Sequence, residues 1–262
     1  MLFSEVLQAM QGGGGEWTAT VGEDWLQGRT VFGGLQAALA VQAMRGALGQ
    51  AAPLRTVQMA FIAPLPAGSF AIQARVLRTG KSATQVEARF AQGGQTLALA
   101  IGIFGASRAS ALDRVPAQPP VPAGKAFAYD YIPGVMPAFL QHFKSRWLRG
   151  APLFSGSTVP EMMFEIDLLD SAATASDLHV LAIADMIPPV ALTMLRKPAL
   201  GSTMTWMVEF LTGRFDGLPL EGWRVDGEML AARDGYTSQA ATVWGPGGEA
   251  VAFSQQSMVV FG

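Results

Sequence analysis

A segment of this chain occurs twice, and the duplication limits what the chain can fold into. Residues 74–105 read ARVLRTGKSATQVEARFAQGGQTLALAIGIFG, and residues 227–262 read GEMLAARDGYTSQAATVWGPGGEAVAFSQQSMVVFG. Arg78-Thr79-Gly80 aligns with Arg233-Asp234-Gly235, about 155 residues later, and each copy ends on Phe-Gly. A repeat of this length predicts two similar structural modules in one chain.

Each copy has the pattern of strands joined by tight turns. β-branched and aromatic residues in 86–91 and 242–244 favour strands. Gly93-Gly94 and Gly247-Gly248 fall at the same place in each copy, and such glycine pairs are typical of hairpin turns. A further strand is expected before each set, at 54–62 in the first copy and at 202–211 in the second.

One apolar helix is expected upstream of each set of strands. Residues 34–48 (GLQAALAVQAMRGAL) are strong helix formers and apolar nearly all round, so this helix should be buried, with Gly49 as its C-cap. Residues 176–187 (SDLHVLAIADMI) are the counterpart, capped by Ser176 or Thr174 and stopped by Pro188-Pro189. A mainly antiparallel sheet wrapped around one central helix is the hot-dog arrangement, so the sequence predicts an α+β, tandem (double) hot-dog fold.

The change in composition between the copies suggests where the modules meet. Residues 108–133 contain Pro116, Pro119, Pro120 and Pro122, which suit an extended spacer. We therefore expect an N-terminal module over residues 1–107, a Pro-rich linker over 108–133 and a C-terminal module over 134–262.

Composition excludes several classes of function. The net charge is −2 and no cysteine is present, which argues against a nucleic-acid surface, thiolate metal sites and a cysteine nucleophile. The two histidines, His142 and His179, are too few for a histidine metal centre and are read as core or surface residues. We expect no metal and no cofactor. The chain shows no signal peptide and no membrane-length apolar run, so a cytoplasmic protein without a membrane partner is expected.

One stretch carries a family resemblance. Residues 28–34 (GRTVFGG), followed by the Ala-rich helix, resemble the opening of the acyl-CoA thioesterase II-like (TesB-like) double hot-dog thioesterases. The resemblance covers nearly the whole chain. It implies hydrolysis of an acyl-CoA in fatty acid metabolism, no cofactor, a homo-oligomer, and an Asp, a Thr and a Gln in the second half that hold the attacking water.

Three residues match that set in order. Asp185 falls in the last turn of the second predicted helix, Thr203 opens the next strand, and Gln256 lies on the last strand. Gln255 rivals Gln256, because adjacent strand residues face opposite sides. The chain departs from relatives that carry Asp-His shortly after the Thr, since it has Thr205-Trp206 there.

The chemistry assigns a role to each candidate. Asp185 would deprotonate the water, while Thr203 and Gln256 would hold it by hydrogen bonds. The free N–H groups of Gly33 and Gly34, at the start of the first helix, would bind the oxyanion that forms on the substrate. The same two glycines have an equally good alternative explanation, which is close packing of the helix.

Other interpretations stay open. The basic residues Lys144, Arg146 and Arg149 would suit CoA phosphates, although a solvated strand edge explains them better. A protein that binds acyl-CoA without cleaving it is the main rival function. A hot-dog enoyl-CoA hydratase ranks lower, because neither histidine follows an aspartate at the spacing that such an enzyme needs.

Overall fold

The computed structural model describes residues 1–49, 52–121, 123–124 and 126–261. Pro122, which belongs to the predicted linker, and Gly262, which closes the second repeat, lie outside the described residues.

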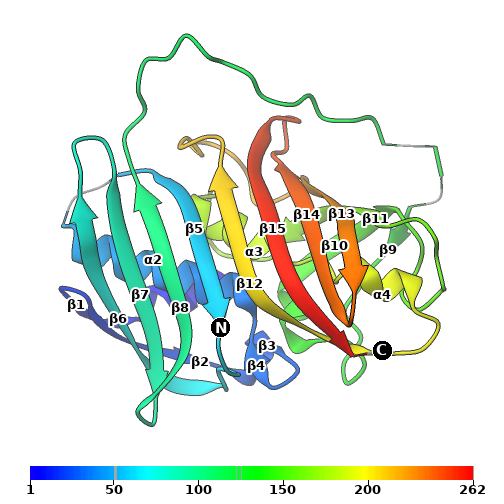
Figure 1. Ribbon diagram of the computed structural model, residues 1–262, viewed down its shortest axis with the longest axis horizontal. Helices are drawn as coiled ribbons and strands as arrows, with labels where there is room; N and C mark the ends of the chain where they lie inside the picture. The colour runs from blue at the N-terminus through cyan, green and yellow to red at the C-terminus, as the bar shows by residue number, and fades with distance from the viewer. Residues whose placement is uncertain (50–51, 122, 125, 262) are drawn as a thin grey trace.

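One antiparallel sheet runs through the whole molecule (Figure 1). Among the described residues it has thirteen strands, in the spatial order β1 (Gln11–Gly13), β2 (Glu16–Val21), β6 (Gly68–Thr79), β7 (Thr84–Gln92), β8 (Gln95–Phe104), β5 (Leu54–Phe61), β12 (Leu200–Phe210), β15 (Ala250–Phe261), β14 (Tyr236–Trp244), β13 (Trp223–Arg233), β11 (Glu161–Leu168), β10 (Phe143–Arg149) and β9 (Phe127–Ala128). A separate small ribbon pairs β3 (Leu26–Gln27) with β4 (Thr30–Val31).

The strand order reads the same from both sides of the centre. Outward from the middle, β5, β8, β7 and β6 in one half correspond to β12, β15, β14 and β13 in the other. The halves join where residues 56–60 of β5 pair with residues 205–209 of β12. The predicted double hot-dog is therefore confirmed, and its two halves share one continuous sheet. Each repeat supplies three consecutive strands of its half, β6–β8 and β13–β15.

The helices lie on one face of this sheet. They are α1 (Phe3–Gln8), α2 (Gly33–Leu48), α3 (Asp177–Ala184) and α4 (Ala191–Met194), with 3₁₀ turns η1 (Glu23–Trp25) and η2 (Ala138–His142). α2 matches its prediction and ends at Gly49, whose φ of 68° is the left-handed C-cap conformation. Every residue of α2 from Gly34 to Val41 is buried, as a central helix requires.

The second helix is shorter than predicted. It begins after the cap residue Ser176, but it ends at Ala184 instead of continuing to Ile187. Pro188 explains the early end, because a proline has no N–H to donate to the carbonyl of Ala184 and disfavours helical backbone in the residue before it. Asp185 consequently stands at the C-cap and not within the last turn.

The two central helices run antiparallel against each other. At one end, a Cβ added to Gly34 of α2 would lie 2.9 Å from the Cα of Ala182 in α3. At the other end, Arg45 of α2 forms an ion pair with Asp177, the first residue of α3. The start of each helix therefore lies beside the end of its partner.

Contacts across the two halves reach beyond the sheet. Ser4 of α1 donates its N–H to Oδ1 of Asp170 in the second half, at 3.0 Å. The rings of Phe32 and Phe139 stack with centroids 4.0 Å apart. Within residues 108–133, for which the sequence predicts a linker, β9 adds to the edge of the second half by pairing with β10. No helix in the described part of the chain is long and apolar enough to span a membrane.

Candidate active site

Asp185 lies where α3 ends and α2 begins. It is the C-cap residue of α3, with a backbone still in the right-handed helical region (φ −98°, ψ −1°), and its side chain turns toward the first residues of α2. A Cβ added to Gly33 would lie 2.6 Å from Oδ2 of Asp185, so the carboxyl group lies against the first turn of α2. The start of a helix carries partial positive charge, so this position favours an anion.

Gln256 brings the last strand to the same carboxyl group. Its side chain points to the helix side of the sheet, is 5% exposed, and donates from Nε2 to Oδ1 of Asp185 at 2.5 Å. The neighbouring Gln255 is exposed and points to the opposite, outer face. The structure thus brings Asp185 and Gln256 together and leaves Gln255 on the far side of the sheet.

Thr203 reaches the inner face through a β-bulge. The pairing of β12 with β15 shifts between Thr203 and Thr205, which leaves Met204 as the extra residue. Thr203 is therefore paired with Met258, whose side chain is buried and lies on the same face as Gln256. Among the described residues, Thr203 forms no hydrogen bond with Asp185 or Gln256, so the structure places it beside the pair without joining it to them.

The surroundings of Asp185 alter its acidity. Burial raises the pKa of Asp185 to about 7, although hydrogen bonds from Gln256 and from the Gly34 N–H act to lower it. Within the described part of the chain, no ionised side chain contributes to this pKa. A carboxyl group with a pKa near 7 has about equal populations of base and acid at neutral pH, which suits proton transfer.

Comparison with known families identifies the chain. Residues 21–105 match the model of the acyl-CoA thioesterase N-terminal domain, and residues 111–260 match that of the acyl-CoA thioesterase C-terminal domain. The chain belongs to the acyl-CoA thioesterase family. No curated protein sequence matches it significantly.

Solved structures agree with the fold of this family member. A hot-dog protein of unknown function from Alicyclobacillus acidocaldarius superposes with a TM-score of 0.87 at 20% identity, over 99% of this chain and 98% of that one. A putative thioesterase II from Thermobifida fusca superposes with a TM-score of 0.82 at 18% identity, over 99% and 97%. An acyl-CoA thioesterase II from Mycobacterium marinum gives 0.76 at 15% identity, over 99% and 98%.

The two glycines at the start of α2 have different surroundings in this thioesterase-family chain. A Cβ on Gly34 would lie 2.7 Å from the ring of Phe32 and 2.9 Å from the Cα of Ala182, so helix packing alone requires a glycine there. Its N–H also acts to lower the pKa of Asp185. The N–H of Gly33 has no hydrogen-bond partner within the described residues. Of the predicted pair, Gly33 therefore remains the candidate oxyanion donor.

Sequence reasoning missed Gln239 of β14. Its Nε2 donates to Oε1 of Gln256 at 2.8 Å, so it belongs to the same buried group of polar side chains. The available signal was its place in a row of alternate residues, Thr237, Gln239, Ala241 and Val243, all of which are buried. A glutamine in such a row needs a partner, but the row can be recognised only once the phase of the strand is known.

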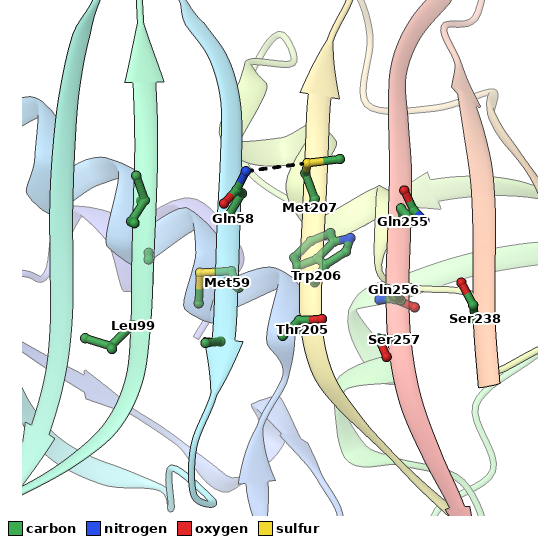
Figure 2. Close-up of a pocket in the computed structure, with 13 residues that line it drawn as sticks. Gln58, Met59, Leu99, Thr205, Trp206, Met207, Ser238, Gln255, Gln256 and Ser257 are labelled. Atoms are coloured by element: carbon green, nitrogen blue, oxygen red, sulfur yellow. Dashed lines mark hydrogen bonds between the residues drawn. The ribbon is translucent and has the colours of Figure 1, made fainter. Parts of the chain in front are cut away.

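The outer face of the sheet has a hollow of about 400 Å³ across the junction of the halves. Figure 2 shows this face, where Gln58 of β5 donates to the sulfur of Met207 in β12 and Gln255 lies on β15. Met207 and Gln255 are cross-strand partners on this face. Asp185 is on the helix side of the sheet and does not line the hollow, although Gln256 is among the residues that do.

The remaining candidates of the sequence have structural roles. Arg146 and Arg149 of β10 form ion pairs with Glu165 and Glu161 of the neighbouring strand, which supports a strand edge over a phosphate site. His142 and His179 are both buried. No group of His, Cys, Asp and Glu that could hold a metal ion occurs in the part of the chain that the structure describes.

Proposed function

We propose that this protein hydrolyses an acyl-CoA thioester with a water molecule activated by Asp185. The observation that carries the proposal is the hydrogen bond between Gln256 and Asp185 at the start of α2, in a chain of the acyl-CoA thioesterase family. A carboxyl group, a fixed amide and a glycine N–H within one small volume are the groups that hydrolysis of a thioester requires.

The reaction divides these groups between two tasks. The water oxygen attacks the thioester carbonyl carbon while Asp185 accepts a proton from the water. The carbonyl oxygen becomes an oxyanion, which the Gly33 N–H at the positive end of α2 stabilises. The C–S bond then breaks, and the CoA thiolate takes the proton from Asp185, which restores the carboxylate. A thiolate is a good leaving group, so no stronger acid is needed.

The polar side chains around Asp185 select the orientation of the water. Gln256 holds one carboxyl oxygen, Oδ1, and leaves Oδ2 for the water. We assign Thr203 to a second contact with that water. Its side chain is on the same face as Gln256, and its cross-strand partner, Met258, is two residues after Gln256 on β15. Its hydroxyl group both donates and accepts, as a bridging role requires.

A thiol-release assay with acyl-CoAs of several chain lengths tests the activity. We expect free CoA to appear with at least one of them. Asp185→Asn keeps the shape of the side chain and removes the base, so turnover should fall by roughly 10²-fold or more while acyl-CoA still binds. Calorimetric binding and circular dichroism check the ligand affinity and the fold of the variant.

Gln256 and Gln255 form a matched pair of variants for the same assay. Gln256→Ala should lower turnover less than Asp185→Asn, because it removes one contact, and Gln255→Ala should leave turnover within about twofold. Binding of acyl-CoA without release of CoA by the wild-type protein would support the non-catalytic rival. Unchanged turnover in Asp185→Asn would reject the mechanism.

Other parts of the proposal rest on the resemblance and the sequence. They are a fatty or related acyl-CoA as substrate, a place in fatty acid metabolism, a homo-oligomeric state and a cytoplasmic location. The boundaries of the two modules and of the linker, residues 1–107, 108–133 and 134–262, also stay predictions.

A further inference from the structure

Gln239 extends the hydrogen bonds of the candidate site to the turn that follows α3. Gln239 of β14 and Gln256 of β15 are cross-strand partners, and both side chains are about 5% exposed or less. The N–H of Val190 donates to Oε1 of Gln239 at 3.0 Å, and Nε2 of Gln239 donates to Oε1 of Gln256 at 2.8 Å. The chain of hydrogen bonds ends where Gln256 donates to Asp185.

The backbone N–H of Val190 determines which group donates and which accepts in each of these hydrogen bonds. A glutamine amide has an oxygen that accepts and an NH₂ group that donates, and the two ends have nearly the same shape. The orientation of a buried glutamine is therefore set by its partners. The backbone N–H of Val190 can only donate, so Gln239 must turn its oxygen toward Val190 and its NH₂ toward Gln256. Gln256 must then accept at its oxygen and donate from its NH₂ to Asp185.

We propose that Gln239 is a positioning residue that holds the NH₂ group of Gln256 against Asp185 and so favours the ionised, basic form of that carboxyl group. The inference rests on the proposed function and adds a residue to it. If Gln256 were reversed, its oxygen would face Asp185 and could accept a hydrogen bond only from the protonated acid. The reversed arrangement would favour the acid form, which cannot take a proton from water.

The surroundings of Asp185 make this orientation matter. The groups of the described residues that affect its pKa are the apolar surroundings, the amide of Gln256 and the N–H of Gly34. No charged side chain of α2, α3 or β15 among the described residues contributes. Gln256 is thus one of two hydrogen-bond donors that act against burial, and Gln239 decides whether it donates.

Two substitutions at Gln239 test the proposal. Gln239→Glu keeps the length of the side chain, but an ionised carboxylate can only accept, so it bonds the Val190 N–H and draws the NH₂ of Gln256 away from Asp185. Gln239→Met removes the amide without adding charge. We expect the acidic limb of the kcat/KM profile to move to higher pH by about one unit in Gln239→Glu and about half a unit in Gln239→Met.

Two control variants separate the orientation of the Gln256 amide from the effects of added charge and of a disturbed turn. Ser238→Glu adds a carboxylate to the neighbouring residue of β14, on the outer face, where it reports the effect of charge alone. Thr193→Val removes the hydrogen bond from Thr193 to the carbonyl of Val190, which disturbs the same turn without touching the amides. We expect the pH profile of Thr193→Val to match the wild type, and that of Ser238→Glu to shift by less than that of Gln239→Glu.

A second measurement does not depend on catalysis. The carboxyl carbon of Asp185, assigned by its loss in Asp185→Asn, is titrated by ¹³C NMR in the wild type and in each variant. A raised midpoint in both Gln239 variants supports the proposal. The proposal is overturned if the midpoints of both Gln239 variants equal that of the wild type. It is also overturned if the midpoint of Gln239→Glu equals that of the control Ser238→Glu. If the wild type releases no CoA, the proposed function fails, while this titration still decides the role of Gln239. If Gln239→Met does not fold, Gln239→Glu, which retains the bond to Val190, decides alone.

Discussion

Each end of the antiparallel helix pair holds a carboxyl group, and the two carboxyl groups have different partners. Where α2 begins and α3 ends, Asp185 meets neutral donors, the amide of Gln256 and the N–H of Gly34. Where α3 begins and α2 ends, Asp177 meets the guanidinium of Arg45. The ion pair compensates the charge of a buried carboxylate, whereas neutral donors compensate it only in part.

The difference shows how one fold can use the same residue type for stability and for chemistry. An aspartate paired with arginine serves a structural contact, since removing Arg45 leaves the buried carboxylate of Asp177 uncompensated. An aspartate held by amides remains close to the midpoint of its titration and can exchange a proton. The duplicated fold therefore places its candidate base at one end of the helix pair only.

The largest expected effect is on stability as a function of pH. The pKa of Asp185 is about 7 in the folded chain and 3.8 for an unperturbed aspartate, so the folded state holds an extra proton between these pH values. Its stabilising contribution is complete below about pH 4 and is lost as the pH rises through 7. The free energy of unfolding of the wild type, minus that of Asp185→Asn, should fall by at most about 4 kcal/mol over that interval.

Urea denaturation at several pH values measures this difference. The subtraction also removes the contribution of other acids, such as Asp170. Burial acts to raise the pKa of Asp170, but hydrogen bonds from His179 and Ser4 hold it below its usual range. A difference that stays constant between about pH 4 and pH 8 would show that Asp185 titrates normally.

Arg45→Met should remove the ion pair with Asp177 at the other end of the helix pair. It leaves the buried carboxylate of Asp177 without its cation, and we expect a loss of about 2 kcal/mol in the free energy of unfolding, since Arg45 itself is partly exposed. Turnover per folded molecule should not change. The double variant Arg45→Met/Asp177→Asn should recover part of the stability. Lower turnover with unchanged stability would show that the two ends are coupled.

The smallest expected effects separate the two adjacent glycines. Gly34→Ala places a methyl group against the backbone of Ala182 and should cost about 1 kcal/mol of stability. Gly33→Ala places the methyl group against the carboxyl group of Asp185 instead, so turnover should fall roughly tenfold with little change in stability. Thermal unfolding and thiol release are measured on both variants. Equal effects of the two substitutions on both quantities would contradict these assignments.

Much of the architecture could be predicted because both halves contain local turn signals that the residues reveal directly. Gly93-Gly94 and Asp234-Gly235 close their hairpins with positive φ angles, which glycine and aspartate tolerate better than most residues. The apolar composition of 34–48 required burial, and a buried helix in each half requires a sheet around it. The prolines predicted the end of the second helix less accurately, since α3 ends three residues before the predicted Ile187.

The detailed arrangement of the site could be predicted only in part. The family resemblance singled out Asp185 and Gln256, but the choice between Gln255 and Gln256 depended on strand phase. Simple alternation from the buried Trp206 would turn Thr203 outward, and the bulge at Met204 reverses this. Gln239 is recognised through a cross-strand pair, and pairing between strands is a property of tertiary structure that a single strand does not contain.

The contact of α1 with the second half has a consequence for synthesis of the chain. Ser4 bonds to Asp170, 166 residues later, and the ring of Phe3 lies 5.2 Å from that of His179. A ribosome makes these partners only after the whole first half and the connecting segment have emerged. Before then, α1 can contact only its own half, where the ring of Phe3 lies 5.9 Å from that of Trp25. The bond from Ser4 to Asp170 and the contact of Phe3 with His179 form later, and they complete the docking of α1 once α3 is in place.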